Sequence, residues 1–194
     1  MTYLRLERIT KRFGSFVANN NINLSVASGT IHALLGENGA GKTTLMNILS
    51  GLYQPDAGQI YLQDKPVKIN SSSEAIRLGI GMIHQHFMLV PQLTVTENII
   101  LGTGDRFNLN LRQKQQEILA LSQTYNLSVD PQARVGDLPV GVQQRVEILK
   151  ALYRKAKLLI LDEPTAVLTP PEVESLIVIL RQLAAVGQTI IFIS

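Results

Sequence analysis

The stretch Gly36-Glu37-Asn38-Gly39-Ala40-Gly41-Lys42-Thr43 decides the fold, because it is a complete G-x-x-x-x-G-K-T sequence. Apolar residues at 31–35 precede it as a short strand, and apolar residues recur at helical spacing over 45–52. Glycines at such a junction let backbone N–H groups converge on phosphate oxygens at the helix start. The pattern predicts that Lys42 reaches the β- and γ-phosphates of a nucleotide and that Thr43 binds Mg²⁺. We expect the nucleotide to be bound by Gly36, Glu37, Asn38, Gly39, Ala40, Gly41, Lys42, Thr43 and Thr44.

A second apolar run, residues 158–161, ends on the acidic pair Asp162 and Glu163. Such a run is typical of a buried parallel strand whose carboxyl end delivers acidic side chains to a site. We expect Asp162 to bind Mg²⁺, directly or through water, and Glu163 to act as general base for an attacking water. An isolated acidic pair could instead cap the next helix. The intact phosphate loop favours the catalytic interpretation.

Composition limits the classes of protein that fit. The 194 residues suffice for one domain that buries about 70% of its unfolded surface. A net charge of +3 is too small to indicate nucleic acid as the main partner. The absence of cysteine excludes disulfides and thiolate metal sites and is compatible with a reducing cytosol. Because the sequence has no signal-peptide pattern and no apolar run of about 18 residues, we expect no membrane-spanning segment.

Hydrophobic periodicity predicts the order of strands and helices around these motifs. Residues 3–9 and 22–26 alternate apolar and polar side chains, as half-exposed antiparallel strands do, and residues 60–69 continue that style. The capping box Thr169-x-x-Glu172, with prolines at the opening positions, marks the start of the last helix. Further expected elements are a short helix at 73–79, a buried strand at 80–83, helices at 111–125 and 142–153, a loop at 126–137 and a final strand at 189–193.

The stretch L-P-V-G-V-Q-Q-R, residues 138–145, opens a predicted helix and resembles the L-S-G-G-Q-x-Q-R signature of ATP-binding cassette (ABC) ATPases. Gln85 matches the glutamine of that family's Q-loop, and Phe13 matches the aromatic residue that stacks on adenine. Residues 164–169 match the loop after the catalytic glutamate. The resemblance covers the whole chain.

Connecting segments at 83–91 and 146–152 are similar to the N-terminal cassette of tandem-cassette importers for nucleosides and simple sugars. The resemblance implies a P-loop α/β cassette over residues 1–194, with a mostly parallel core sheet, helices on both faces, an N-terminal antiparallel β-subdomain and a helical signature subdomain at about 88–150. It implies an ATP hydrolase at the cytoplasmic face of the cell membrane, with ATP and Mg²⁺ as cofactors. The implied partners are a second ATP-binding cassette, transmembrane permease subunits and, indirectly, a solute-binding protein, with no nucleic acid.

The resemblance also implies roles for single residues. Gln85 would bind Mg²⁺ or the attacking water and take part in catalysis, and Phe13 would stack on adenine. Each has a simpler alternative: Phe13 as core packing and Gln85 as a surface residue. His84 and His86 flank Gln85 but lack a third ligand, so they are more typical of surface residues than of a metal site. The signature residues that would reach the partner's ATP are Leu138, Gly141, Gln144 and Arg145.

Several positions depart from the family pattern. Pro139 replaces the signature serine, and valines stand at 140 and 142, so we expect this signature to be weak. Thr169 stands where the family usually has an aspartate. The sequence stops at Ser194, where the family's switch histidine would follow, which predicts a C-terminally truncated cassette with almost no turnover alone. Two alternatives remain open: a soluble, non-transport ABC ATPase acting on ribosomes or DNA, and a nucleotide-binding fragment without turnover.

Overall fold

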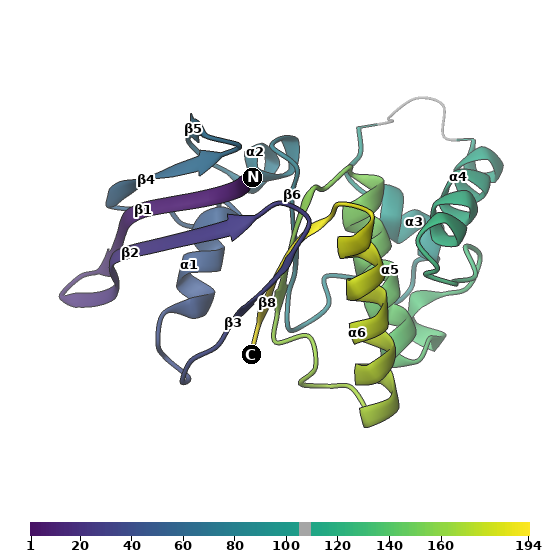
Figure 1. The fold of residues 1–194 in the computed structure, drawn as a ribbon. Coiled ribbons are helices and arrows are strands. Elements are labelled where there is room, and N and C mark those ends of the chain that lie inside the picture. The colour runs from purple at the N-terminus through teal and green to yellow at the C-terminus, as the bar shows by residue number, and fades with distance from the viewer. Residues whose placement is uncertain (105–109) are drawn as a thin grey trace.

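The computed structural model describes residues 1–104 and 110–194, which form two sheets with helices packed against them (Figure 1). One sheet is antiparallel, in the order β2-β1-β4-β5, and the other is parallel, in the order β3-β8-β7-β6. The strands are β1 (Thr2–Phe13), β2 (Phe16–Ala27), β3 (Ile31–Leu34), β4 (Ala57–Leu62), β5 (Lys65–Val67), β6 (Ile80–Ile83), β7 (Leu158–Asp162) and β8 (Thr189–Ile193). The helices are α1 (Lys42–Leu49), α2 (Ser72–Arg77), α3 (Val95–Ile100), α4 (Leu111–Thr124), the 3-10 turn η1 (Val135–Asp137), α5 (Val140–Tyr153) and α6 (Pro170–Ala185).

The parallel sheet lies at the centre of the molecule because both of its faces are covered. Every residue of β7 is buried, and alternate side chains point to opposite faces. Leu159 and Leu161 belong to the core that α3, α5 and α6 complete. Leu158 and Ile160 belong to a second core, shared with α1 and the antiparallel sheet. The predicted parallel core with helices on both faces is confirmed, and the antiparallel sheet adds to the cover on the α1 side.

The predicted N-terminal antiparallel strands are also confirmed, but they are longer than expected. Strands β1 and β2 extend to a turn at Gly14 and Ser15, beyond the predicted segments 3–9 and 22–26. The apolar alternation fades toward this turn because most side chains there face solvent. Backbone pairing with β2 therefore continues where the hydrophobic pattern stops.

The register of the parallel strands brings their carboxyl ends to one edge of the sheet. Ile83 of β6 pairs with Leu161, and Ile193 of β8 pairs with both Asp162 and Leu34. The loop after Leu34 leaves the sheet at this edge and enters α1 (Figure 1). Open α/β sheets bind ligands outside the carboxyl ends of their strands. This edge therefore positions the candidate site.

One feature of the helical region differs from the sequence prediction. Helix α3 was not predicted, although it begins with a capping box made by Thr94 and Glu97. Helix α5 runs from 140 to 153 and also packs on the parallel sheet, and the expected helical subdomain at about 88–150 stays a prediction. The other predicted helices and strands of residues 72–193 begin and end within about two residues of the observed bounds, as expected for such assignments.

Candidate functional site

The end of the phosphate loop is fixed against β2. Gly41 has a φ of 84°, and a Cβ there would lie 2.3 Å from the carbonyl oxygen of Ala18. The Asn19 side-chain amide, from a residue that is 4% exposed, donates to the Gly41 carbonyl at 3.1 Å. Conformation and space both require glycine at position 41. The predicted loop is thus a rigid connection between β3 and α1.

Lys42 is the first residue of α1, and its ammonium group folds back over the loop. It donates to the carbonyl oxygens of Gly36 and, at 3.1 Å, of Glu37. Among the described residues, no side chain caps α1 and no acidic residue lies in its first turn. The backbone N–H groups and the positive end of the helix dipole are therefore open to an anion.

Thr43 and Asp162, the two residues expected to bind Mg²⁺, come together from α1 and the end of β7. The Thr43 hydroxyl donates to the Asp162 carboxylate at 3.5 Å. Burial raises the pKa of Asp162, the adjacent Glu163 carboxylate raises it further, and the Thr43 hydroxyl opposes both effects. A bound cation would favour the ionised form. These two oxygen donors fit Mg²⁺, which prefers hard oxygen ligands and takes only one or two carboxylates from a protein when phosphates supply the rest.

Glu163 stands in a strained conformation beside the phosphate loop. Its φ of 48° is left-handed, which costs about 1 kcal/mol or more for a residue with a Cβ. The Glu163 N–H donates to the carbonyl of Ile193 at 3.2 Å, which ties this residue to β8. Its side chain lines a pocket of about 230 Å³. The other lining residues are Phe16, Ala18, Glu37, Asn38, Gly39, Ala40, Gly41, Lys42, Thr43 and Thr44.

The aromatic residues near this pocket differ from the sequence prediction. Phe13 lies at the end of β1 with its ring edge-on to Tyr53, 5.2 Å between centroids, and it is 43% exposed. The aromatic side chain that lines the pocket is Phe16, across the Gly14 turn. Adenine stacking by Phe13 stays a prediction. The pair of phenylalanines around a glycine was the available signal for Phe16.

Gln85 is exposed and follows β6 by two residues. The pairing of β6 with β7 ends at Ile83 and Leu161, so Gln85 lies in the loop beyond the carboxyl end of β6. His84, the residue before it, is close enough to lower the pKa of Asp162. The role of Gln85 toward metal or water stays a prediction.

The signature residues make contacts within the chain. The Gly141 N–H donates to the Glu172 carboxylate at 3.1 Å. The Gln144 amide, buried at 2% exposure, donates to the Pro164 carbonyl at 2.9 Å, in the loop that follows Glu163. Helix α5 is therefore linked to the segment that leaves the candidate site.

The remaining two signature residues, Leu138 and Arg145, contact the core and the loop after α4. Leu138 packs on the core, and the Arg145 guanidinium reaches the Ser128 carbonyl at 3.5 Å. In the described part of the chain, no signature residue lines the pocket at the phosphate loop. A role toward a nucleotide on another cassette stays a prediction.

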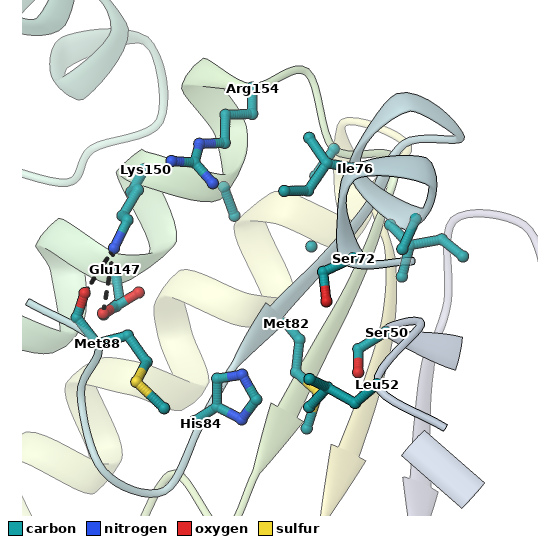
Figure 2. Close-up of a pocket in the computed structure, with 15 residues that line it drawn as sticks. Ser50, Leu52, Ser72, Ile76, Met82, His84, Met88, Glu147, Lys150 and Arg154 are labelled. Carbon is teal, nitrogen blue, oxygen red and sulfur yellow. Dashed lines mark hydrogen bonds and ion pairs between the residues drawn. The ribbon is translucent and has the colours of Figure 1, made fainter. Parts of the chain in front are cut away.

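Sequence reasoning missed a second hollow, of about 200 Å³, between α2, β6 and α5 (Figure 2). Lys150 donates to the Met88 carbonyl at 2.7 Å and lies 3.8 Å from the Glu147 carboxylate. Burial raises the pKa of Glu147 and lowers that of Lys150, so desolvation outweighs the mutual attraction of the two charges. Glu147 Oε1 and Arg154 Nε are buried and lack a hydrogen-bond partner among the described atoms. A Glu and a Lys three residues apart in an apolar helix were the available signal.

Across residues 1–104 and 110–194, no helix combines the length and the apolar character needed to cross a membrane. The same residues contain no group of three or more His, Cys, Asp and Glu side chains arranged for a metal ion. Thr43 and Asp162 form a smaller oxygen pair beside the phosphate loop.

Known proteins resemble this chain over its whole length. The chain is 56% identical over 195 residues to the nucleoside import ATP-binding protein NupA of Lactococcus lactis subsp. cremoris, covering 100% of this chain and 38% of that protein. It is 53% identical to the guanosine import ATP-binding protein NupO of Bacillus subtilis, covering 97% of this chain and 37% of that protein. The glucose import ATP-binding protein TsgD13 of Haloferax volcanii is 47% identical, with coverage of 99% and 40%. The chain therefore spans less than half the length of these relatives.

Comparison with a family model and with solved structures gives the family. The crystal structure of an ATP-binding cassette of an ABC transporter, in its ADP conformation, has a TM-score of 0.87 and 28% identity, covering 100% of this chain and 81% of that one. This match confirms the predicted cassette fold. The ABC transporter family model matches residues 19–166, which include the phosphate loop, the signature and the acidic pair. The chain therefore belongs to the ABC transporter family and forms a nucleotide-binding cassette of it.

Proposed function

We propose that this cassette is part of the ATP-binding subunit of an importer, in which ATP binding and hydrolysis drive uptake of nucleosides or simple sugars. The convergence of the phosphate loop, Asp162 and Glu163 at one edge of the parallel sheet carries the proposal. The names of its relatives supply the direction of transport and the solute class. The subunit would act at the cytoplasmic face of the membrane.

The geometry gives each group a task toward ATP. Loop N–H groups would hold phosphate oxygens, and the Lys42 ammonium would exchange the Gly36 and Glu37 carbonyls for the β- and γ-phosphates. Thr43 and Asp162 would hold Mg²⁺, which neutralises phosphate charge when bound. Glu163 would accept a proton from the attacking water. The signature, Gly141 above all, would face the nucleotide of a second cassette.

The hollow in Figure 2 is the surface that we assign to the permease. Its mouth carries exposed apolar side chains, and its wall carries the ion pair of Glu147 with Lys150 and the side chain of Arg154. A protein segment with apolar side chains would bury this apolar mouth. The hollow begins next to Gln85, so occupation of it would act on the loop beside the acidic pair. The apolar residues at its mouth are Leu52, Ile76 and Met88.

Uptake measurements on cells that carry the complete protein test the proposal. Lys42→Ala should abolish uptake of the transported solute, and parallel assays with radiolabelled guanosine, uridine, ribose and glucose identify that solute. The complete protein carrying Glu163→Gln should also co-purify with an integral membrane permease from detergent extracts. Normal uptake of all four solutes by Lys42→Ala, with no permease recovered, would contradict the proposal in favour of a non-transport cassette.

A further inference from the structure

The first turn of α5 holds a backbone N–H group that its own helix does not use. Pro139 is the N-cap residue, and its carbonyl accepts from Val142 at 2.9 Å and from Gln143 at 3.0 Å. The Gly141 N–H donates instead to Glu172 Oε1 at 3.1 Å. A carboxylate from α6 thus occupies the positive end of the α5 dipole.

Glu172 is held at this place from the α6 side as well. Its Oε2 accepts from the Thr169 N–H at 2.9 Å and from the Thr169 hydroxyl at 2.8 Å, which completes the capping box of α6. One carboxylate therefore bridges the starts of two helices. A Cβ on Gly141 would lie 2.7 Å from Glu172 Oε1, so a glycine is what lets the carboxylate approach.

We propose that Glu172 is an internal competitor at the start of α5. Its carboxylate accepts the hydrogen bond of the Gly141 N–H while the cassette is unpaired, and the γ-phosphate of a nucleotide on a second cassette has to displace it. This inference rests on the proposed pairing of cassettes. One N–H cannot donate a well-aligned hydrogen bond to two anions at once, and two negative charges in contact repel each other. The exchange of carboxylate for phosphate would release one tie between α5 and α6.

Self-association in the presence of Mg-ATP tests the competition. The reference is the Glu163→Gln chain, in which ATP should persist, and the comparison adds Glu172→Gln. Glutamine preserves the capping box but removes the charge. We expect about tenfold tighter ATP-dependent association by sedimentation, with unchanged ATP affinity of the monomer, and about tenfold corresponds to 1.4 kcal/mol. The matched control is Glu174→Gln, an exposed glutamate on the same helix, which should leave association unchanged. Equal or weaker association with Glu172→Gln than with Glu174→Gln would overturn the inference.

A second measurement does not depend on pairing. Inorganic phosphate is titrated into the isotope-labelled chain while the Gly141 amide resonance is followed. Glu172→Ala should bind phosphate at this amide at least about tenfold more tightly than the wild type, because the competing carboxylate is gone, and Glu174→Ala should match the wild type. If no variant associates with ATP but phosphate distinguishes Glu172→Ala, the pairing fails for this chain and the competition stands. If phosphate moves the Gly141 resonance equally in all three proteins, or in none, the inference is wrong.

Discussion

Helices α1 and α5 both start at a segment that lacks a side-chain N-cap, yet their amino ends serve opposite purposes. At α1, no acidic residue of the described chain belongs to the first turn, the Asp162 carboxylate contacts the Thr43 hydroxyl, and Lys42 adds a positive charge beside a pocket. At α5, the Glu172 carboxylate accepts from the Gly141 N–H. The same helix dipole thus creates an open anion site in one place and an internally occupied one in the other.

The glycines at these two starts differ in the same way. Gly41 is required by its left-handed φ and by a backbone carbonyl 2.3 Å from the missing Cβ. Gly141 lies within α5, and the group nearest to its missing Cβ is a carboxylate at the end of a flexible side chain, at 2.7 Å. The first helix start is fixed by the backbone, whereas the second depends on a side chain that can move.

The largest expected effect is on the rate of ATP hydrolysis at the pocket beside α1. In the complete protein, Glu163→Gln should preserve ATP binding and lower hydrolysis by about 10² or more, since a positioned base contributes about 10²–10⁴ in rate. Calorimetry with ATP and a phosphate-release assay measure the two quantities. Wild-type turnover in this variant would move the base away from the α1 pocket.

The next effect concerns stability at the fixed glycine. Gly41→Ala should lower the free energy of unfolding by at least about 2 kcal/mol, because the left-handed φ and the clash with the Ala18 carbonyl act together. Urea denaturation measures this loss. Gly39→Ala is a matched control, since that glycine shares a φ of 84° but has no atom within 4 Å of its missing Cβ. If the two variants lose the same stability, the contact with Ala18 contributes nothing.

A smaller effect tests the open anion site directly. Lys42→Ala should weaken ATP binding by about tenfold or more, or about 1.4 kcal/mol, because the Lys42 ammonium is the side-chain charge that borders the loop carbonyls. Lys65→Ala, at an exposed position of β5, has the same net charge as Lys42→Ala and should bind ATP as the wild type does. Unchanged affinity in Lys42→Ala by calorimetry would remove the phosphate-loop interpretation.

A glycine-to-alanine substitution should be tolerated at the start of α5, although it is not tolerated at the start of α1. Gly141→Ala loses the carboxylate contact, which costs about 1 kcal/mol, but gains up to about 1 kcal/mol of helix propensity, so the net change in stability should be near zero. In the Glu172→Ala background only the gain remains. A double-mutant cycle by urea denaturation should therefore show a coupling of about 1 kcal/mol. Additive effects of the two substitutions would mean that they do not interact.

The sequence was sufficient for the open site because its information is local. A contiguous loop defines residues 36–43, and an apolar run ending in acids placed Asp162 at the edge where β3 also ends. The parallel register follows from burial on both faces, which a continuous apolar strand signals. The left-handed φ of Glu163 was not predictable, since no residue pattern around it signals one and its N–H donates to Ile193, a residue distant in the chain.

The occupied site was beyond sequence reasoning because it is a contact between helices. The capping box of Thr169 and Glu172 was predicted, but the second oxygen of Glu172 accepts from Gly141, 31 residues earlier in the chain. Nothing local predicts how α5 and α6 align. The same limit applies to the position of Phe16, which follows from the β1–β2 turn, and to the contact of Lys150 with the Met88 carbonyl.

The smallest effect is a pH dependence of stability that comes from the Glu172 carboxylate. The Thr169 N–H, the Thr169 hydroxyl and, to a smaller extent, the Gly141 N–H and Arg145 lower the pKa of Glu172, against an opposing effect of burial. A carboxyl whose folded pKa lies below its unfolded value adds stability above the unfolded pKa and loses it as pH falls through the folded one. Wild type should therefore exceed Glu172→Gln in melting temperature above about pH 5, and the difference should shrink as the pH falls toward about 3. Glu174→Gln, on the same helix, is the control for the change in net charge. A difference between wild type and Glu172→Gln that is the same at every pH would mean that ionisation of Glu172 strengthens neither the Thr169 capping box nor the contact with Gly141.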